Sequence, residues 1–460
     1  MESSRTGINR RGFLRGGGLL AAGIGATPLI AGCKGSAGGG DSDNLTIWWN
    51  QGYYPEEDQA AKKIVEKWQK KTGKKADLQL YGTQDIVTKE QSAVAAGEPP
   101  DIIYAQKGFT PTYAFQGKLE DLSDVIESTD LTDGAKRAAH LYNQKAGKVS
   151  YYSIPLHQFT VSMFYWRSLI TQAGMDDKHL PTDWDGYWKF WKSVQDASKN
   201  KGKKGIYAVG WPMGTAAGDT NYDTQQILRS FGVELLDDKS QLKADDPDVR
   251  KGIAAALDFL GGLFSDGYTP KACINWQDDG NNTAFLSKTL VSTPNGSLSI
   301  PGALKDENDK DWKDMVTAVW PERAVGGTMP SLSLTHNAIV FTNSKKKKLA
   351  KDFLSFMMRP ENIGAVLEGG KGRWFPVNQS LLTKPFWSKS TDPNIKVVAN
   401  QLASDTAANW ADLSPAYQKV ETTHVWGKAI GQVALNGKSG DDAADYALTQ
   451  MSQIFDQFKH

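Results

Sequence analysis

The chain has 460 residues, of which 40% are hydrophobic and 23% charged, which is typical of a soluble globular protein with two or three domains. The formal net charge of +1 excludes the strong basic field on which nucleic-acid binding depends. The two cysteines, Cys33 and Cys273, cannot build a disulfide framework or a zinc cluster. The six histidines show no metal-ligand spacing, so we expect neither metal nor cofactor.

The N-terminus reads as an export signal. Residues 9–15 are NRRGFLR, and a weakly apolar stretch too short to span a membrane follows up to Ile30. The twin arginine resembles signals that export folded proteins, and Leu29–Cys33 resembles a lipobox. We therefore predict a twin-arginine lipoprotein signal peptide at 1–32, and a lipidated Cys33 with a flexible tether at 33–44. An Arg-rich start followed by an uncleaved anchor is the alternative.

Strand and helix patterns alternate from residue 45 onward. Apolar or alternating runs predict strands at 45–49, 76–81 and 101–104, and helical spacing predicts helices at 56–71 and 84–96. This βαβ order favours a parallel or mixed sheet covered by helices on both faces.

Three later segments carry clear helix patterns. Asp246-Pro247 is a suitable N-cap and first-turn pair for a helix with one apolar face. Residues 349–358 predict a largely buried helix that ends at Arg359-Pro360. An apolar stripe predicts a C-terminal helix near 442–458.

Several segments, in shared order, resemble extracellular solute-binding proteins of the family 1 type, the maltose-binding-protein-like group. They are AVAAGEPPDIIYA (93–105), GKLEDLSD (117–124), SIPLHQFTVSMFYWRSLITQAGM (153–175), PTDWDGYWKF (181–190), FLSKTLVSTPNGSLSI (285–300), GGKGRWFPV (369–377) and NGKSGDDAADYALTQM (436–451). Near Asn295-Gly296, many sugar-binding members carry a Trp where this chain has Ser297-Leu298, so the resemblance leaves the identity of the sugar open.

The resemblance implies an α/β, two-lobed, type II periplasmic-binding-protein fold, with a mixed sheet in each lobe and hinge strands between them. Lobe 1 is expected to comprise residues 45–153 and 335–372, and lobe 2 residues 154–334 and 373–460. The implied function is the capture of a sugar or oligosaccharide between the lobes and its delivery to the permease subunits of an ABC importer. We expect a monomeric binding protein, not an enzyme, anchored through Cys33 to the outer face of the cytoplasmic membrane or its periplasmic side.

A sugar site needs flat aromatic faces for the ring and amide or hydroxyl groups for its hydroxyls. Candidates should lie on loops at strand ends. We expect ligand contacts from Trp49, Asn50, Gln51, Tyr53, Gln106, Lys107, His157, Gln158, Trp211, Asn295, Ser297 and Trp374. Trp374 matches a late aromatic of the family most closely. A structural role is the alternative for each residue, since tryptophans and single histidines also pack in protein cores.

Other ligands and activities fit less well. A polyol or another small solute would suit the same fold, but a polyamine calls for acidic residues in the cleft loops. Tyr151-Tyr152 could ligate iron, although their place in the hinge match favours a structural role. The Asp-rich loop near Trp276 lacks EF-hand spacing, so we assign no metal. A secreted glycoside hydrolase would need a recognisable carboxylate pair, which the chain does not show.

Overall fold

The computed structural model describes residues 44–52, 55–105, 109–305 and 307–459. Cys33 and the predicted signal peptide lie outside these residues, as do Tyr53, Gln106 and Lys107. Among the described residues, no helix combines the length and apolar character needed to cross a membrane.

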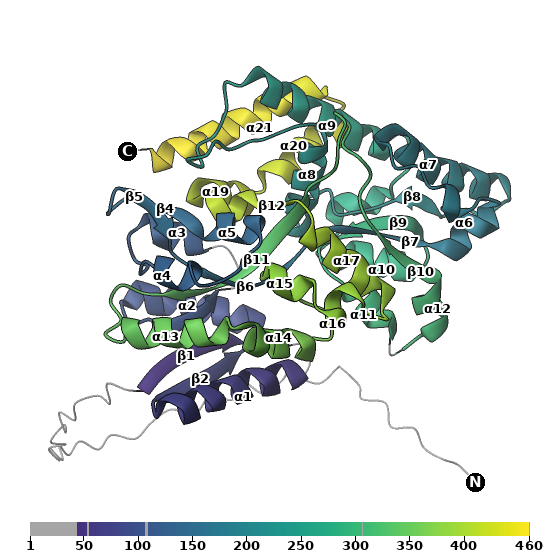
Figure 1. Cartoon of the computed structure of the whole chain (residues 1–460). Helices are drawn as coiled ribbons and strands as arrows, with labels where there is room; N and C mark the ends of the chain where they lie inside the picture. The colour runs from purple at the N-terminus through teal and green to yellow at the C-terminus, as the bar shows by residue number, and fades with distance from the viewer. Residues whose placement is uncertain (1–43, 53–54, 106–108, 306, 460) are drawn as a thin grey trace, which may run out of the picture. The chain divides into compact units, whose positions relative to one another are not determined.

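Two mixed sheets form the framework within residues 42–460 (Figure 1). The first has the order β12-β11-β3-β1-β2, with β6 also paired to β11. The second has the order β10-β7-β9-β8, and β4 and β5 form a separate hairpin. The strands are β1 (Asn44–Asn50), β2 (Lys75–Tyr81), β3 (Ile102–Ala105), β4 (His140–Asn143), β5 (Lys148–Tyr151), β6 (Ile154–Phe159), β7 (Ser162–Trp166), β8 (Tyr207–Val209), β9 (Leu290–Asn295), β10 (Met315–Ala318), β11 (Ser331–Val340) and β12 (Thr406–Ala408).

Helices cover both sheets. They are α1 (Pro55–Thr72), α2 (Thr83–Ala96), α3 (Phe109–Phe115), α4 (Ser123–Ile126), α5 (Asp133–Ala139), α6 (Arg167–Ala173), α7 (Trp184–Asn200), α8 (Asp219–Ser230), α9 (Pro247–Ser265), α10 (Gly280–Leu286), α11 (Ser299–Lys305), α12 (Asp309–Asp314), α13 (Lys347–Met357), α14 (Pro360–Gly369), α15 (Gln379–Leu382), α16 (Pro385–Ser388), α17 (Pro393–Ala403), α18 (Trp410–Leu413), α19 (Pro415–Thr422), α20 (Val425–Ala434) and α21 (Gly440–Phe455). Helices α1 and α2 flank β1, β2 and β3, whereas α7 and α10 pack on the second sheet.

Local sequence signals explain most of these elements. The three N-terminal strands and the two helices between them are confirmed; β1, β3 and α1 bury the apolar positions that predicted them, whereas Ala76, Leu78 and Leu80 of β2 are half-buried. Asp246 caps α9 by accepting hydrogen bonds from the backbone N–H groups of Asp248 (2.9 Å) and Val249 (3.3 Å). The C-terminal α-helix ends at Phe455, three residues earlier than expected, and a 3-10 turn over Asp456–Phe458 completes it.

Strands β6 and β11 connect the two sheets. β6 belongs to the first sheet, and β7, which starts three residues after β6 ends, belongs to the second. β10 of the second sheet likewise leads into β11 of the first. β6 and β11 pair antiparallel, side by side, with His157 directly opposite His336 (Figure 1). We call this place the crossing. The predicted lobe boundaries remain a prediction; β12, from the range assigned to lobe 2, pairs with β11 in the first sheet.

Cys273 is fully buried, and burial raises its pKa to about 11, so it behaves as the small interior residue expected of a lone thiol. Tyr151 packs its ring against His140, with ring centroids 5.0 Å apart, and Tyr152 is buried. Among the described residues, no three His, Cys, Asp or Glu side chains are placed to hold a metal ion together.

Candidate ligand-binding site

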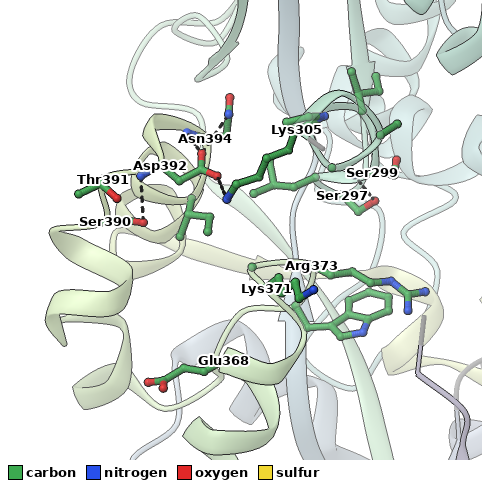
Figure 2. Close-up of a pocket in the computed structure, with 18 of the residues that line it drawn as sticks. Ser297, Ser299, Lys305, Glu368, Lys371, Arg373, Ser390, Thr391, Asp392 and Asn394 are labelled. Atoms are coloured by element: carbon green, nitrogen blue, oxygen red, sulfur yellow. Dashed lines mark hydrogen bonds and ion pairs between the residues drawn. The ribbon is translucent and has the colours of Figure 1, made fainter. Parts of the chain in front are cut away.

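A cavity of about 1110 Å³ lies beside Trp374. Its walls come from α11 with the preceding turn at 297–298, from the segment 371–374 that follows α14, and from α16 and the start of α17. Figure 2 shows Ser297, Ser299 and Lys305 across the cavity from Lys371 and Arg373. Elements far apart in the sequence therefore enclose one space large enough for a small organic ligand.

Three of the cations at this cavity have carboxylate partners. Lys305 Nζ lies 2.8 Å from an Asp392 oxygen, as the dashed line in Figure 2 marks. Lys371 Nζ is 3.3 Å from a Glu56 oxygen. An Arg373 nitrogen lies 3.7 Å from Glu57, and its guanidinium stacks 4.4 Å from the centre of the Trp374 indole. In each pair the carboxylate balances the charge of the cation. These three cations therefore produce no concentrated positive field that would select an anionic ligand.

Five aromatic and imidazole side chains meet next to this cavity, at the crossing. Trp49 is the penultimate residue of β1, Tyr104 lies on β3, His157 on β6 and His336 on β11, and Trp374 completes the group, which we call the crossing cluster. The Trp374 ring centroid is 4.6 Å from that of His157 and 4.9 Å from that of His336. A small cavity of about 30 Å³ lies against Trp49, Tyr104, His157 and Trp374. Trp374 therefore lines both cavities and links them.

Hydrogen bonds join three polar side chains of this cluster, while His157 Nδ1 is buried without a hydrogen-bond partner in the protein. The Tyr104 hydroxyl is 2.5 Å from His157 Nε2 and 3.1 Å from His336 Nδ1. Burial, followed by the positive charges of His336 and Arg373, keeps the pKa of His157 well below its ordinary value. His157 is therefore neutral at physiological pH and can hold a hydroxyl in a fixed orientation.

The structure brings part of the predicted site together. Trp49, Asn50, His157 and Trp374 surround the small cavity, and Ser297 lines the large one. Asn295 supports that wall, since its amide donates to the Ser297 carbonyl (2.8 Å) and to Ser299 Oγ (3.0 Å). Gln51 is exposed directly after β1. Their contacts with a ligand remain a prediction.

Two predicted residues lie in the interior instead. Gln158 is fully buried; its amide donates to the Pro376 carbonyl (2.7 Å) and accepts from Ser333 Oγ (2.6 Å), so it ties β6 to its neighbours. Trp211 is 1% exposed and packs edge-on against Trp188, with ring centroids 5.9 Å apart. Neither lines the two cavities described above. These positions favour packing roles, because the Gln158 amide already has its partners within the protein and the Trp211 ring is packed against another indole.

Sequence reasoning did not identify Tyr104 or His336. Both lie within strands, not on the loops after them, and only the pairing of β3 and β6 with β11 places them beside His157. A His in the middle of the apolar run at 331–340 was a usable signal, because an interior strand rarely carries an unpartnered imidazole.

Comparisons with known proteins agree with this architecture. The chain is 24% identical over 432 residues to the diacetylchitobiose binding protein DasA of Streptomyces coelicolor, covering 90% of each chain. The cyclic alpha-maltosyl-1,6-maltose binding protein from Arthrobacter globiformis superposes with a TM-score of 0.70 at 20% identity, over 90% of this chain and 99% of that one. A sugar transporter protein from Arthrobacter chlorophenolicus, with bound laminaribiose, gives a TM-score of 0.65 at 18% identity, over 89% and 99%.

These superpositions confirm the predicted fold class, an α/β fold with mixed sheets of the type II periplasmic-binding-protein kind. Residues 63–397, more than half of the chain, match the family described as bacterial extracellular solute-binding protein. That is a family of binding proteins that act outside the cytoplasm. The chain belongs to the bacterial extracellular solute-binding protein family.

Proposed function

We propose that the protein captures a sugar or oligosaccharide beside Trp374 and delivers it, chemically unchanged, to the permease subunits of an ABC importer. One observation carries this proposal: the half-buried indole of Trp374 lines a cavity of about 1110 Å³ and packs on the imidazoles of the hydrogen-bonded network at the crossing. An indole face suits the C–H face of a sugar ring, and neighbouring imidazole, amide and hydroxyl groups suit its hydroxyls. The sugars bound by the relatives named above support the same ligand class.

The two-sheet architecture suggests how capture is coupled to delivery. A ligand held by α11 on one side and by Trp374 on the other gains contacts from both walls when they approach. Binding then shifts the population toward a closed form by the difference in affinity between the two forms. We propose that the permease recognises this closed form, that the protein works as a monomer, and that a lipidated Cys33 holds it at the outer face of the cytoplasmic membrane or its periplasmic side.

A calorimetric and thermal-shift panel tests the ligand class. It contains maltose, laminaribiose, N,N′-diacetylchitobiose, a sugar alcohol, amino acids and a polyamine. We expect a sugar to bind and to stabilise the protein by about 2.7 kcal/mol at a concentration one hundred times its Kd. Stabilisation by amino acids alone, or conversion of a sugar into product, would contradict the proposal.

A variant pair localises the site. Trp374→Ala should weaken sugar binding about tenfold to a hundredfold, because it removes the stacking surface. Tyr142→Ala is the matched control, since Tyr142 is an aromatic residue that is 41% exposed on the β4–β5 hairpin. If both variants bind the sugar like the original chain, Trp374 does not belong to the site.

A further inference from the structure

The first two turns of α8 are unusual because they bury polar side chains. Thr220, Asp223 and Thr224 are each 1% exposed, and their spacing places them on one face of the helix. Both carboxylate oxygens of Asp223 and the hydroxyls of the two threonines are buried without a hydrogen-bond partner in the protein. Buried polar groups in proteins nearly always have partners, so this face is suited to receiving donors from another molecule.

Two more carboxylates lie at the start of the same helix. Asp278 accepts hydrogen bonds from the backbone N–H groups of Gly218 (2.6 Å) and Asp219 (3.2 Å), which fixes its carboxylate there. Asp219 lies one turn before Asp223. Burial, and then the charges of Asp219 and Asp278, raise the pKa of Asp223 well above its ordinary value. A positive charge at this place would therefore relieve the repulsion that Asp219 and Asp278 exert on Asp223.

This group lies behind the wall of the large cavity and contacts residues next to those that line it. Tyr222, between Asp219 and Asp223, packs so closely on Gly296 that a Cβ there would lie 3.0 Å from the Tyr222 hydroxyl. Ser297, which follows Gly296, lines the cavity, and so does Asp279, which follows Asp278. Asp219 and Tyr222 are half-buried and Asp278 is exposed, so the open side of the group is formed by these three residues, with Asp223 behind them.

We infer that Asp219, Asp223 and Asp278 form a subsite for a protonated amino group on the bound sugar; the inference rests on the proposed function. An ammonium group offers three donors and no acceptor, which suits a face where both Asp223 carboxylate oxygens and the oxygens of the Thr220 and Thr224 hydroxyls are free to accept. A metal ion fits less well, because no three of these or other described acidic, His or Cys side chains are placed to ligate one ion. Acidic residues in the cleft loops are the usual signature of a cationic ligand, but here the acids Asp219 and Asp223 lie on a helix.

Three disaccharides that differ only in the substituent on C2 test the inference. They are chitobiose with free amines, N,N′-diacetylchitobiose and cellobiose, compared by calorimetry at pH 6, where the amines are protonated. We expect chitobiose to bind about tenfold to a hundredfold more tightly than cellobiose, the range for hydrogen bonds to charged groups. Equal affinities, or a preference for the acetylated sugar, would overturn the inference and leave the proposed function standing. If neither these sugars nor any in the panel above bind, the proposed function itself is wrong.

Charge-removing variants locate the subsite. Asp223→Asn keeps the shape of the side chain and should reduce chitobiose affinity about tenfold or more, with a smaller effect on cellobiose. Asp219→Asn, at a half-buried position that tolerates change better, should act in the same direction if the first variant folds poorly. Asp185→Asn, an exposed acid on α7, is the control and should change neither affinity. Unchanged discrimination in both subsite variants, or stabilisation of the protein by Ca²⁺ in place of the amine, would overturn the inference.

Discussion

The chain contains two clusters of aromatic side chains. They share residue types but differ in what surrounds them. The α7 cluster consists of Trp184, Trp188 and Trp191 on α7, with Trp211, and none of its indoles is more than 8% exposed. The crossing cluster contains Trp374, which is half-buried, together with the bonded His157–Tyr104–His336 network. The α7 cluster buries apolar surface against the second sheet. The crossing cluster holds polar side chains in fixed positions beside a cavity.

Their polar atoms show the difference most clearly. The indole N–H groups of Trp188, Trp191 and Trp211 are buried without partners in the protein. Such burial costs about 1–3 kcal/mol for each group, and the large apolar area of each ring offsets it. At the crossing, in contrast, the Tyr104 hydroxyl contacts both imidazoles, although His157 Nδ1 is also buried without a partner. An abundance of tryptophan is therefore no sign of a binding site unless the rings accompany ordered polar groups and open space.

The largest expected effect is on stability, in the α7 cluster. Trp191 is fully buried and contacts the rings of Tyr165, Tyr187 and Phe190. Trp191→Ala should lower the free energy of unfolding by about 4–5 kcal/mol, because the substitution leaves a cavity. Urea unfolding measures this loss, and Trp191→Phe should cost clearly less. A variant that unfolds like the original chain but binds sugar poorly would contradict the division between the clusters.

The next largest effect decides the role of Trp211. Trp211 makes a ring contact with Trp188 alone among the described residues. Trp211→Ala should therefore lower the free energy of unfolding by about 3–4 kcal/mol. Calorimetry below the unfolding temperature should give the same sugar Kd as the original chain. A large loss of affinity with full stability would return Trp211 to the ligand site, as its Gly- and Pro-rich loop suggested.

The two clusters show which features could be predicted from the sequence and which could not. The elements β1, α1 and α9 were predictable because their signals are local: a short apolar run, apolar residues at helical spacing, and a capping Asp followed by Pro. The place of Trp374 beside a cavity was predictable from its matched segment, and its contact with a ligand stays a prediction. His336 was not, because only the register of β6 against β11 places it opposite His157. Trp211 and Gln158 were predicted at the site because a strand-end position indicates which loop a residue is on, but not whether neighbouring elements cover it.

The smallest expected effect is the pH dependence of the crossing cluster. The pKa of His157 in the folded protein lies well below 6.5, so below pH 6.5 the unfolded chain binds a proton that the folded chain does not. The stability that neutral His157 contributes is therefore present above pH 6.5 and is lost as the pH falls. The slope contributed by this one group should be about 1 kcal/mol per pH unit, close to the limit of 1.4. His336, Tyr104 and Arg373 contact or face His157, and Glu57 and Asp58 line the same small cavity, so the whole group sets this value.

Urea unfolding of the original chain and of His157→Gln between pH 7.5 and 5.5 measures this contribution, because groups that do not contact the crossing cluster titrate equally in both proteins. We expect the variant to show the shallower fall in stability. His179→Gln serves as the control, because His179 is exposed and should leave the slope unchanged. If His157→Gln loses stability with the same slope as the original chain, the proton is accepted elsewhere, and the crossing cluster differs from the α7 cluster only in its exposure and not in its polar order.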